Sequence, residues 1–193
     1  MQDNTNSMMK RLESKLLLVF SYLLIAGVAL LRLEHINVYN VIPVFSCLLL
    51  FAATRPAREY CIPLFALVGV DVFLTTHQYS YTLTIGSAVT WVGYLIVMLL
   101  GRGFLRGGLS ARLAVTFSLL ASISFFLASN FVVWAEWGMY PKIWSGLGTC
   151  YVAALPFFRN SIASEVVFSL LIFSFARNCE AYVPVLRMRR VCS

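Results

Sequence analysis

Charged side chains are scarce in this chain of 193 residues. Only 12% are Asp, Glu, Lys or Arg, about half the share that is usual in a soluble domain. Apolar residues make up 60%, and the mean hydropathy is +0.82. A single small core cannot bury so much apolar surface. The composition therefore excludes a water-soluble fold and predicts a protein that is partly solvated by membrane lipid.

The sequence also lacks the short motifs of nucleotide hydrolysis and of nucleophilic catalysis, such as a Walker A loop, G-x-S-x-G or G-x-G-x-x-G. Its five cysteines show no C-x-x-C spacing, and its two histidines, His35 and His77, show no metal-ligand spacing. We therefore expect no enzyme, no cofactor and no metal site. Energy for any active transport then comes from another subunit or from an ion gradient.

Six apolar runs predict the fold, an all-α membrane bundle of about six transmembrane helices that forms a single domain over residues 1–193. A helix that crosses the hydrocarbon needs about 20 residues, so the second, third and sixth runs are short. We expect Gly101-Arg102-Gly103 to end the fourth run. The runs cover residues 16–33, 38–54, 60–76, 83–100, 113–134 and 161–176.

A long aromatic connection is expected between the fifth and sixth runs, over residues 135–160. Within it, residues 150–158 are apolar enough to form a re-entrant or interfacial piece. The alternative is a longer sixth helix that is broken at Pro156.

Basic residues set the orientation, because cytoplasmic loops carry an excess of Lys and Arg. Three of the fifteen, Arg32, Lys142 and Arg159, lie on one predicted side of the membrane and the other twelve on the opposite side. This pattern predicts both termini in the cytoplasm, with residues 1–15 as an N-terminal segment and 177–193 as a basic tail. With the charges in short loops, nucleic acid is not an expected partner.

Small residues recur every fourth position in the fifth run, at Ala114, Ser118 and Ser122. Such a ladder lets helix backbones approach closely in lipid. It predicts packing within the bundle, and the alternative is an interface with a partner.

Two carboxylates, Asp71 and Glu165, lie inside apolar runs. A charge within the bilayer is costly and usually faces the interior of a bundle. Both are predicted at a similar depth in the outer half, where Arg32 and Arg159 are candidate partners. Structural ion pairing and contact with a ligand both remain open.

The outer side is rich in aromatic and hydrogen-bonding residues, which together typify a small-molecule pocket. The structural alternative for the aromatic residues is an interfacial belt. The candidate substrate-binding residues are Arg32, His35, Asp71, His77, Asn130, Trp134, Tyr151, Arg159, Asn160 and Glu165.

The stretch from Asn130 to Asn160 carries a resemblance. Tyr140-Pro141-Lys142 and the run from Cys150 to Asn160, with Asn130 and Trp134 upstream, resemble an uncharacterised bacterial family of small multi-pass membrane proteins described as candidate transport proteins. That family is similar to the substrate-binding S components of energy-coupling-factor vitamin transporters. The resemblance implies an outward pocket capped by loops, and a partner module of two ATPases with a coupling subunit. The first run departs from it, since Ala26 and Ala29 lack the Ala-x-x-x-Ala spacing of S components.

Three hypotheses follow for a protein of the bacterial inner membrane. The first is the substrate-binding subunit for uptake of a small, vitamin-like molecule or micronutrient. The second is a membrane scaffold or assembly factor without a ligand. The third, a membrane enzyme using Cys150, His77 or Glu165, has the least support, because spacing alone does not bring a nucleophile, a base and an orienting group together.

Overall fold

The computed structural model describes residues 2–34, 41 and 43–191, with side chains described for 15–34, 41 and 43–179. Every regular element in these residues is helical. The all-α prediction is confirmed. Six α-helices are present in the described part: α1 (Gln2–Leu33), α2 (Val44–Thr54), α3 (Cys61–Phe73), α4 (Ile85–Leu100), α5 (Ala111–Glu136) and α6 (Trp144–Val191). Three short helical turns adjoin them: η1 (Ala57–Glu59), a 3₁₀ turn, and the π turns η2 (Leu74–Gln78) and η3 (Gly101–Leu105).

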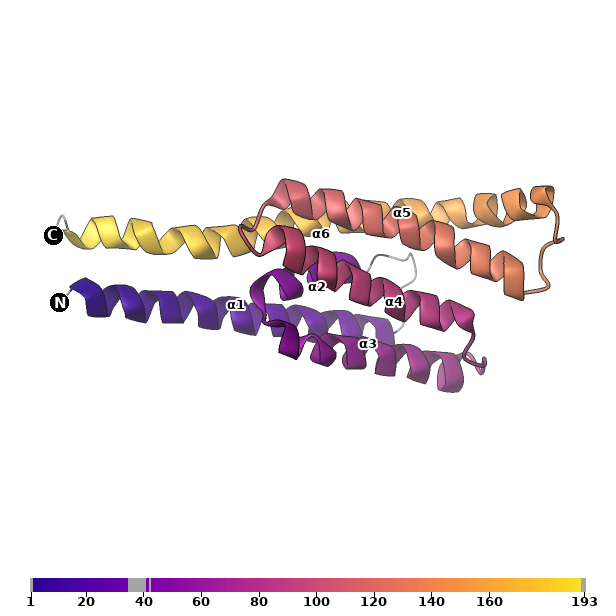
Figure 1. The fold of residues 1–193 in the computed structure, drawn as a ribbon, viewed down its shortest axis with the longest axis horizontal. Coiled ribbons are helices and arrows are strands. Elements are labelled where there is room, and N and C mark those ends of the chain that lie inside the picture. The colour runs from indigo at the N-terminus through magenta and orange to yellow at the C-terminus, as the bar shows by residue number, and fades with distance from the viewer. Residues whose placement is uncertain (1, 35–40, 42, 192–193) are drawn as a thin grey trace.

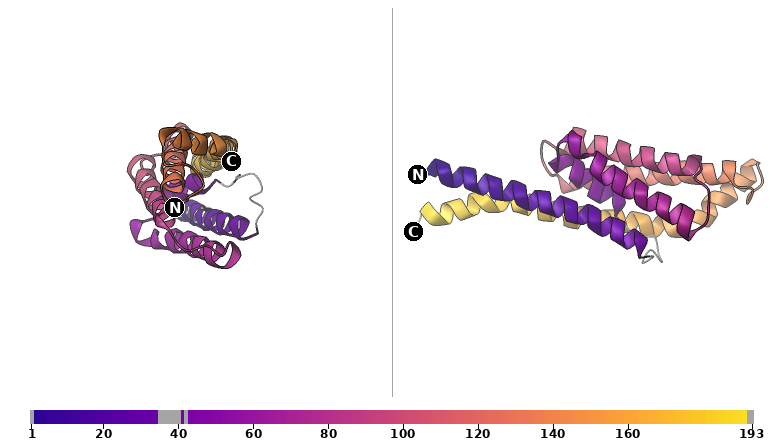
Figure 2. Two further views of the ribbon diagram at one scale, coloured as in Figure 1. Left: turned by 90° about the vertical axis from the view of Figure 1, so that its right-hand side faces the viewer. Right: turned by 90° about the horizontal axis from the view of Figure 1, so that it is seen from below.

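The helices run back and forth along one long axis, so that both termini lie at the same end of the bundle (Figure 1). The start of α1 and the end of α6 extend side by side beyond the other helices at that end (Figure 2). We call it the terminal end, and the other, where α5 turns into α6, the hairpin end. Five of the helical stretches are long and apolar enough to cross a membrane, as expected for a multi-pass membrane protein.

Helix α2 is different, because it has only 11 residues and extends about 16 Å at 1.5 Å per residue, about half the thickness of the hydrocarbon core. It is also the core of the bundle. Every residue from Phe45 to Ala53 is buried, and α2 contacts α1, α4, α5 and α6. Helices that face lipid are exposed along one side, whereas α2 is enclosed all round, which explains its apolar sequence on every face.

The expected start of this helix near residue 38 is wrong. Val41 and Pro43 are described and are not helical, and α2 begins at Val44. Proline disfavours a helical conformation in the residue before it, so Pro43 limits extension of α2 toward residue 38. Residues 38–40 and Ile42 lie outside the described part of the chain.

The fourth run does not end at Gly101. The backbone continues from α4 through the π turn η3 to Leu105. Gly101 is required there for close packing, because a Cβ atom at this position would lie 2.7 Å from the Leu49 carbonyl oxygen and 3.1 Å from the Leu49 Cα. The glycine that signalled a helix end in the sequence is therefore a contact point between η3 and α2.

The sixth helix is much longer than residues 161–176. Helix α6 begins at Trp144 and continues through Pro156 without a break, so the re-entrant or interfacial interpretation of residues 150–158 is wrong. Proline is tolerated in membrane helices where neighbours compensate, and here α5 lies alongside. The Tyr151 hydroxyl donates to the Leu127 carbonyl oxygen at 2.7 Å, and the rings of Phe126 and Phe158 stack at 4.1 Å.

The small-residue ladder packs within the bundle, as expected. Ala114, Ser118 and Ser122 are the buried residues of α5. The Ser169 hydroxyl of α6 donates to the Ser118 hydroxyl at 2.9 Å. The ladder therefore lets α6 approach α5.

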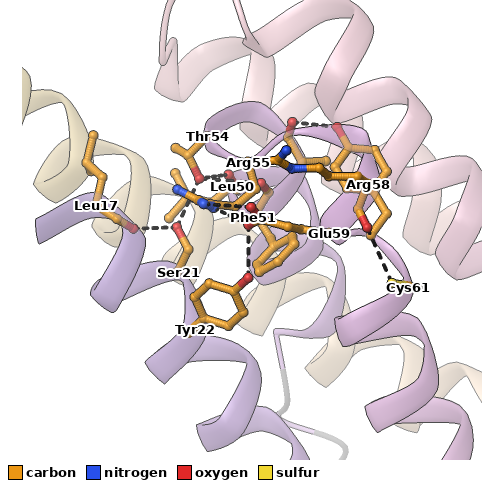
Figure 3. Close-up of polar contacts among 12 residues, drawn as sticks. Leu17, Ser21, Tyr22, Leu50, Phe51, Thr54, Arg55, Arg58, Glu59 and Cys61 are labelled. Atoms are coloured by element: carbon orange, nitrogen blue, oxygen red, sulfur yellow. Dashed lines mark hydrogen bonds and ion pairs between the residues drawn. The ribbon is translucent and has the colours of Figure 1, made fainter. Parts of the chain in front are cut away.

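Polar contacts at the terminal end fix the last turn of α2 (Figure 3). Arg55 donates two hydrogen bonds to Glu59, at 2.7 and 3.0 Å, and the Tyr22 hydroxyl of α1 donates to the same carboxylate at 2.9 Å. The bonds to Glu59 raise the pKa of the Arg55 guanidinium. Ser21 and Thr54 share a hydroxyl hydrogen bond of 2.9 Å. Helices α1 and α2 are thus joined at this end by polar groups as well as by apolar packing.

The packing at Gly101 predicts that Gly101→Ala destabilises the protein by about 1–3 kcal/mol, because the added methyl group clashes with backbone atoms that cannot rotate away. The matched control is Gly103→Ala in the same turn, where a Cβ meets nothing within 4 Å. Denaturant unfolding in detergent micelles compares the two variants. Equal unfolding midpoints for both variants would contradict the packing role.

Candidate ligand-binding cavity

A cavity of about 610 Å³ lies beside the N-terminal end of α2. It is lined by residues from α1, α2, α4, α5 and α6, the α3–η2 segment, and the loop between η2 and α4. The volume is in the range of small-molecule sites. The lining combines aromatic rings, hydroxyl groups and three charged side chains: Arg32, Asp71 and Glu165.

Arg32 and Asp71 form an ion pair within the bundle. An Arg32 terminal nitrogen lies 2.6 Å from Asp71 Oδ1, and the side chains are 22% and 11% exposed. Tyr94 of α4 completes the group, since its hydroxyl accepts from Arg32 and donates to Asp71 Oδ2 at 3.1 Å. Three helices thus contribute to one closed polar ring, which compensates both charges.

Glu165 of α6 is only 3% exposed and binds the N-terminus of α2. Its Oε1 accepts from the Phe45 backbone N–H and its Oε2 from the Ser46 backbone N–H, both at 2.9 Å. The Ser46 hydroxyl also donates to Oε2. The first N–H groups of a helix lack intrahelical partners and carry a partial positive charge. A carboxylate from another helix therefore satisfies the start of α2 in place of a cap from its own sequence.

A chain of hydroxyl groups continues from Glu165 between α2, α5 and α6. The Ser46 and Ser169 hydroxyls are 2.7 Å apart, and Ser169 donates to Ser118 at 2.9 Å. All three serines are fully buried. These bonds order the small side chains that surround the beginning of α2.

Aromatic residues line the cavity toward the hairpin end. Tyr81, in the loop between η2 and α4, packs edge-to-face against Trp137 with ring centroids 5.2 Å apart. Both residues line the cavity. The loop turns sharply at Ser80, whose φ of 52° lies in the left-handed region, and the Ile85 N–H at the start of α4 donates to Glu136 of α5 at 3.2 Å. The loop that lines the cavity at this end therefore contacts the end of α5.

Four of the predicted site residues line the cavity: Arg32, Asp71, Asn130 and Glu165. The Asn130 amide donates to the Phe126 carbonyl oxygen at 2.8 Å. The predicted pairing of Asp71 with Arg32 is confirmed, whereas Glu165 binds α2 rather than either arginine.

Five other predicted residues lie off the cavity lining. His77 is exposed and stacks on Phe73 at 5.3 Å. The Trp134 indole N–H donates to the Pro141 carbonyl oxygen at 2.9 Å, and Tyr151 bonds to Leu127, as described above. Arg159 is exposed and Asn160 is half-buried on α6. His35 lies outside the described residues.

The sequence analysis missed the cavity face of α4. Ser87, Thr90, Trp91 and Tyr94 all line the cavity, and their spacing of three and four residues places them on one side of a helix. This stripe of polar side chains within an apolar run could have predicted that one face of α4 lines a polar cavity. The Trp91 indole nitrogen is buried and makes no hydrogen bond of normal geometry, although it lies beside Asp71.

Among the described residues, no three His, Cys, Asp or Glu side chains come together as metal ligands. Asp71 and Glu165 are each occupied by separate partners. The cavity therefore offers shape, aromatic surface and hydrogen bonds, which suit binding.

Glu165→Ala is predicted to destabilise the protein by about 3 kcal/mol or more, because two N–H groups of α2 would be left buried without acceptors. Glu165→Gln should be intermediate, because an amide offers only one acceptor oxygen. The control is Ser164→Ala, since the adjacent Ser164 is buried and its hydroxyl has no hydrogen-bond partner. It should change stability by less than about 1 kcal/mol. Equal losses for Glu165→Ala and Ser164→Ala in denaturant unfolding would show that the carboxylate does not hold α2.

The Arg32–Asp71 pair predicts strong coupling in a double-mutant cycle. Arg32→Met and Asp71→Leu should each cost about 2 kcal/mol or more, because each leaves the other charge unpaired in the bundle. The double variant should lose clearly less than the sum of both. Arg159→Met, which removes an exposed arginine, should stay within about 0.5 kcal/mol of the unchanged protein. Additive losses in unfolding experiments would argue against the pair.

Comparison with known proteins identifies one family for this chain. No curated protein and no solved structure matches the chain. One family model does match, over residues 11–186, and thus covers all six helices at least in part. The chain belongs to the family described as a "Family of unknown function (DUF6580)".

Proposed function

We propose that this protein is the substrate-binding subunit of a membrane uptake system and holds a small, vitamin-like organic molecule or micronutrient in the cavity beside α2. The observation that carries the proposal is the cavity itself. Residues from all six described α-helices line about 610 Å³ of space. That is a large volume for a chain of this size to leave unfilled by its own side chains.

The composition of the lining supports a binding role. Aromatic walls are combined with a few polar groups in fixed positions, which is the usual pattern of small-molecule sites. The polar ring of Arg32, Asp71 and Tyr94 and the contact of Glu165 with α2 hold the surrounding helices in place. A site whose walls are ordered before the ligand arrives binds it at a lower entropic cost.

The direction of uptake follows from the distribution of basic residues. The end of α2 with η1, and the end of α4 with η3, lie toward the terminal end (Figure 1). These two segments carry four arginines: Arg55, Arg58, Arg102 and Arg106. By the positive-inside rule this end faces the cytoplasm. The hairpin end, with Tyr81 and Trp137 on the cavity lining, then faces the outside of a bacterial inner membrane, and in this proposal the ligand enters from that side.

A partner module would supply the energy. The sequence carries no nucleotide-binding motif, so the resemblance to S components implies ATPase and coupling subunits as partners. In this proposal the protein catalyses no reaction and needs no cofactor, and lipid surrounds the exposed apolar faces of its outer helices.

Mass spectrometry of the protein, purified gently from its native membrane, tests capture. The intact protein should carry a stoichiometric organic ligand and should lose most of it in the variant Thr90→Phe, because Thr90 lines the cavity and a ring there fills part of the space. Val92→Phe is the matched control on the same helix, since Val92 is 58% exposed on the outer surface and should leave the ligand bound.

Two results would contradict the proposal. One is a protein that carries no organic ligand even after incubation with cell extract. The other is a ligand retained equally by Thr90→Phe and Val92→Phe. Partner membrane proteins that co-purify without any ligand would favour the scaffold hypothesis instead.

A further inference from the structure

The charged groups of the cavity are already bound to partners within the protein, and this restricts what a ligand can carry. The inference that follows rests on the proposed capture function and adds the chemical class of the substrate.

All three charges in the lining are compensated locally. Arg32 and Asp71 neutralise each other, and the Tyr94 hydroxyl accepts a hydrogen bond from Arg32 and donates one to Asp71. Glu165 accepts from two backbone N–H groups of α2 and from the Ser46 hydroxyl, where the helix dipole opposes its negative charge. An ionic ligand would have to break one of these arrangements or enter the bundle without a counter-charge, and both are costly.

Three uncharged polar groups of the wall direct a proton at the protein backbone. The Thr90 hydroxyl donates to the Gly86 carbonyl oxygen at 3.0 Å and the Ser122 hydroxyl to the Ser118 carbonyl oxygen at 2.8 Å. The amide nitrogen of Asn130 must face the Phe126 carbonyl oxygen at 2.8 Å, because a carbonyl only accepts. The lone pairs of these hydroxyls and the Asn130 amide oxygen remain as acceptors, while the second Asn130 N–H and the buried Trp91 indole N–H, which makes no hydrogen bond of normal geometry, remain as donors. The wall therefore offers both donors and acceptors to an uncharged ligand.

The remaining wall is aromatic. Phe126 and Phe158 stack at 4.1 Å, and Phe45 meets Phe125 edge-to-face at 5.8 Å, with all four rings on the lining. Flat rings bind well against such surfaces, by stacking or by edge-to-face contact.

We propose that the ligand of this cavity is an uncharged aromatic molecule whose polar groups form hydrogen bonds with the wall. The ion pair and the carboxylate then serve to hold the helices around the ligand, and they do not recognise a charge on it.

Three probes of nearly equal shape test this class on the protein in lipid nanodiscs, with empty nanodiscs to correct for partitioning. Benzamide is uncharged, benzamidinium is a cation and benzoate is an anion. Equilibrium dialysis should show benzamide bound most tightly. The two ions should be weaker by about tenfold or more, because each brings an uncompensated charge. Benzamide binding should be lost in Thr90→Phe and kept in Val92→Phe.

Each outcome separates this inference from the proposed function. Tighter binding of benzamidinium or benzoate that disappears in Thr90→Phe would overturn the uncharged class and leave capture intact. If no probe binds and the natively purified protein also carries no ligand, the capture function itself is contradicted.

Discussion

A helix that begins inside a membrane bundle presents N–H groups that water cannot reach, and α2 is such a helix. The Glu165 carboxylate meets this requirement from α6, more than a hundred positions along the chain, by accepting from Phe45 and Ser46. Much of the remaining architecture depends on this contact. It fixes the depth at which α2 starts, and it places α2 between α5 and α6, where the Ser46–Ser169–Ser118 hydroxyl contacts form. It also leaves free space beyond the N-terminus of α2, which becomes the cavity.

The two ends of α2 are held by different chemistry. At its start, a buried carboxylate from α6 binds backbone N–H groups, whereas at its end, Arg55 and Glu59 form an ion pair that Tyr22 of α1 joins. Between them, Gly101 lets the turn after α4 approach the backbone of Leu49. The short helix is therefore fixed along its whole length. A rigid central helix suits a binding site, because the cavity wall that contains Phe45 does not need to be ordered when a ligand arrives.

The carboxylates illustrate why a charge inside a membrane span does not identify a ligand contact by itself. Asp71 and Glu165 both line the cavity, and both are bound to groups of the protein itself. The polar ring with Arg32 and Tyr94 joins α1, α3 and α4, while Glu165 joins α6 to α2. Between them these two residues connect five helices at about the level of the cavity. The rings and the uncharged polar groups of the wall are then the groups that remain for recognition, and this division underlies the proposed preference for an uncharged ligand.

Composition and the length of the apolar runs are enough to predict helices that could cross a membrane, because both reflect the thickness of the hydrocarbon core. They also predict Asp71 and Glu165 as interior residues, Arg32 as a candidate partner and the Ala114–Ser118–Ser122 ladder as a packing surface, since a charge or a small-residue period is visible within an apolar run. The start of α2 at Val44, the close contact at Gly101 and the continuation of α6 through Pro156 could not be read from the sequence. These features depend on which helix lies alongside. The cavity likewise depends on how the helices pack. Thr90, Trp91 and Tyr94 line it only because α4 is placed against the other helices, and spacing within a single segment does not contain that information.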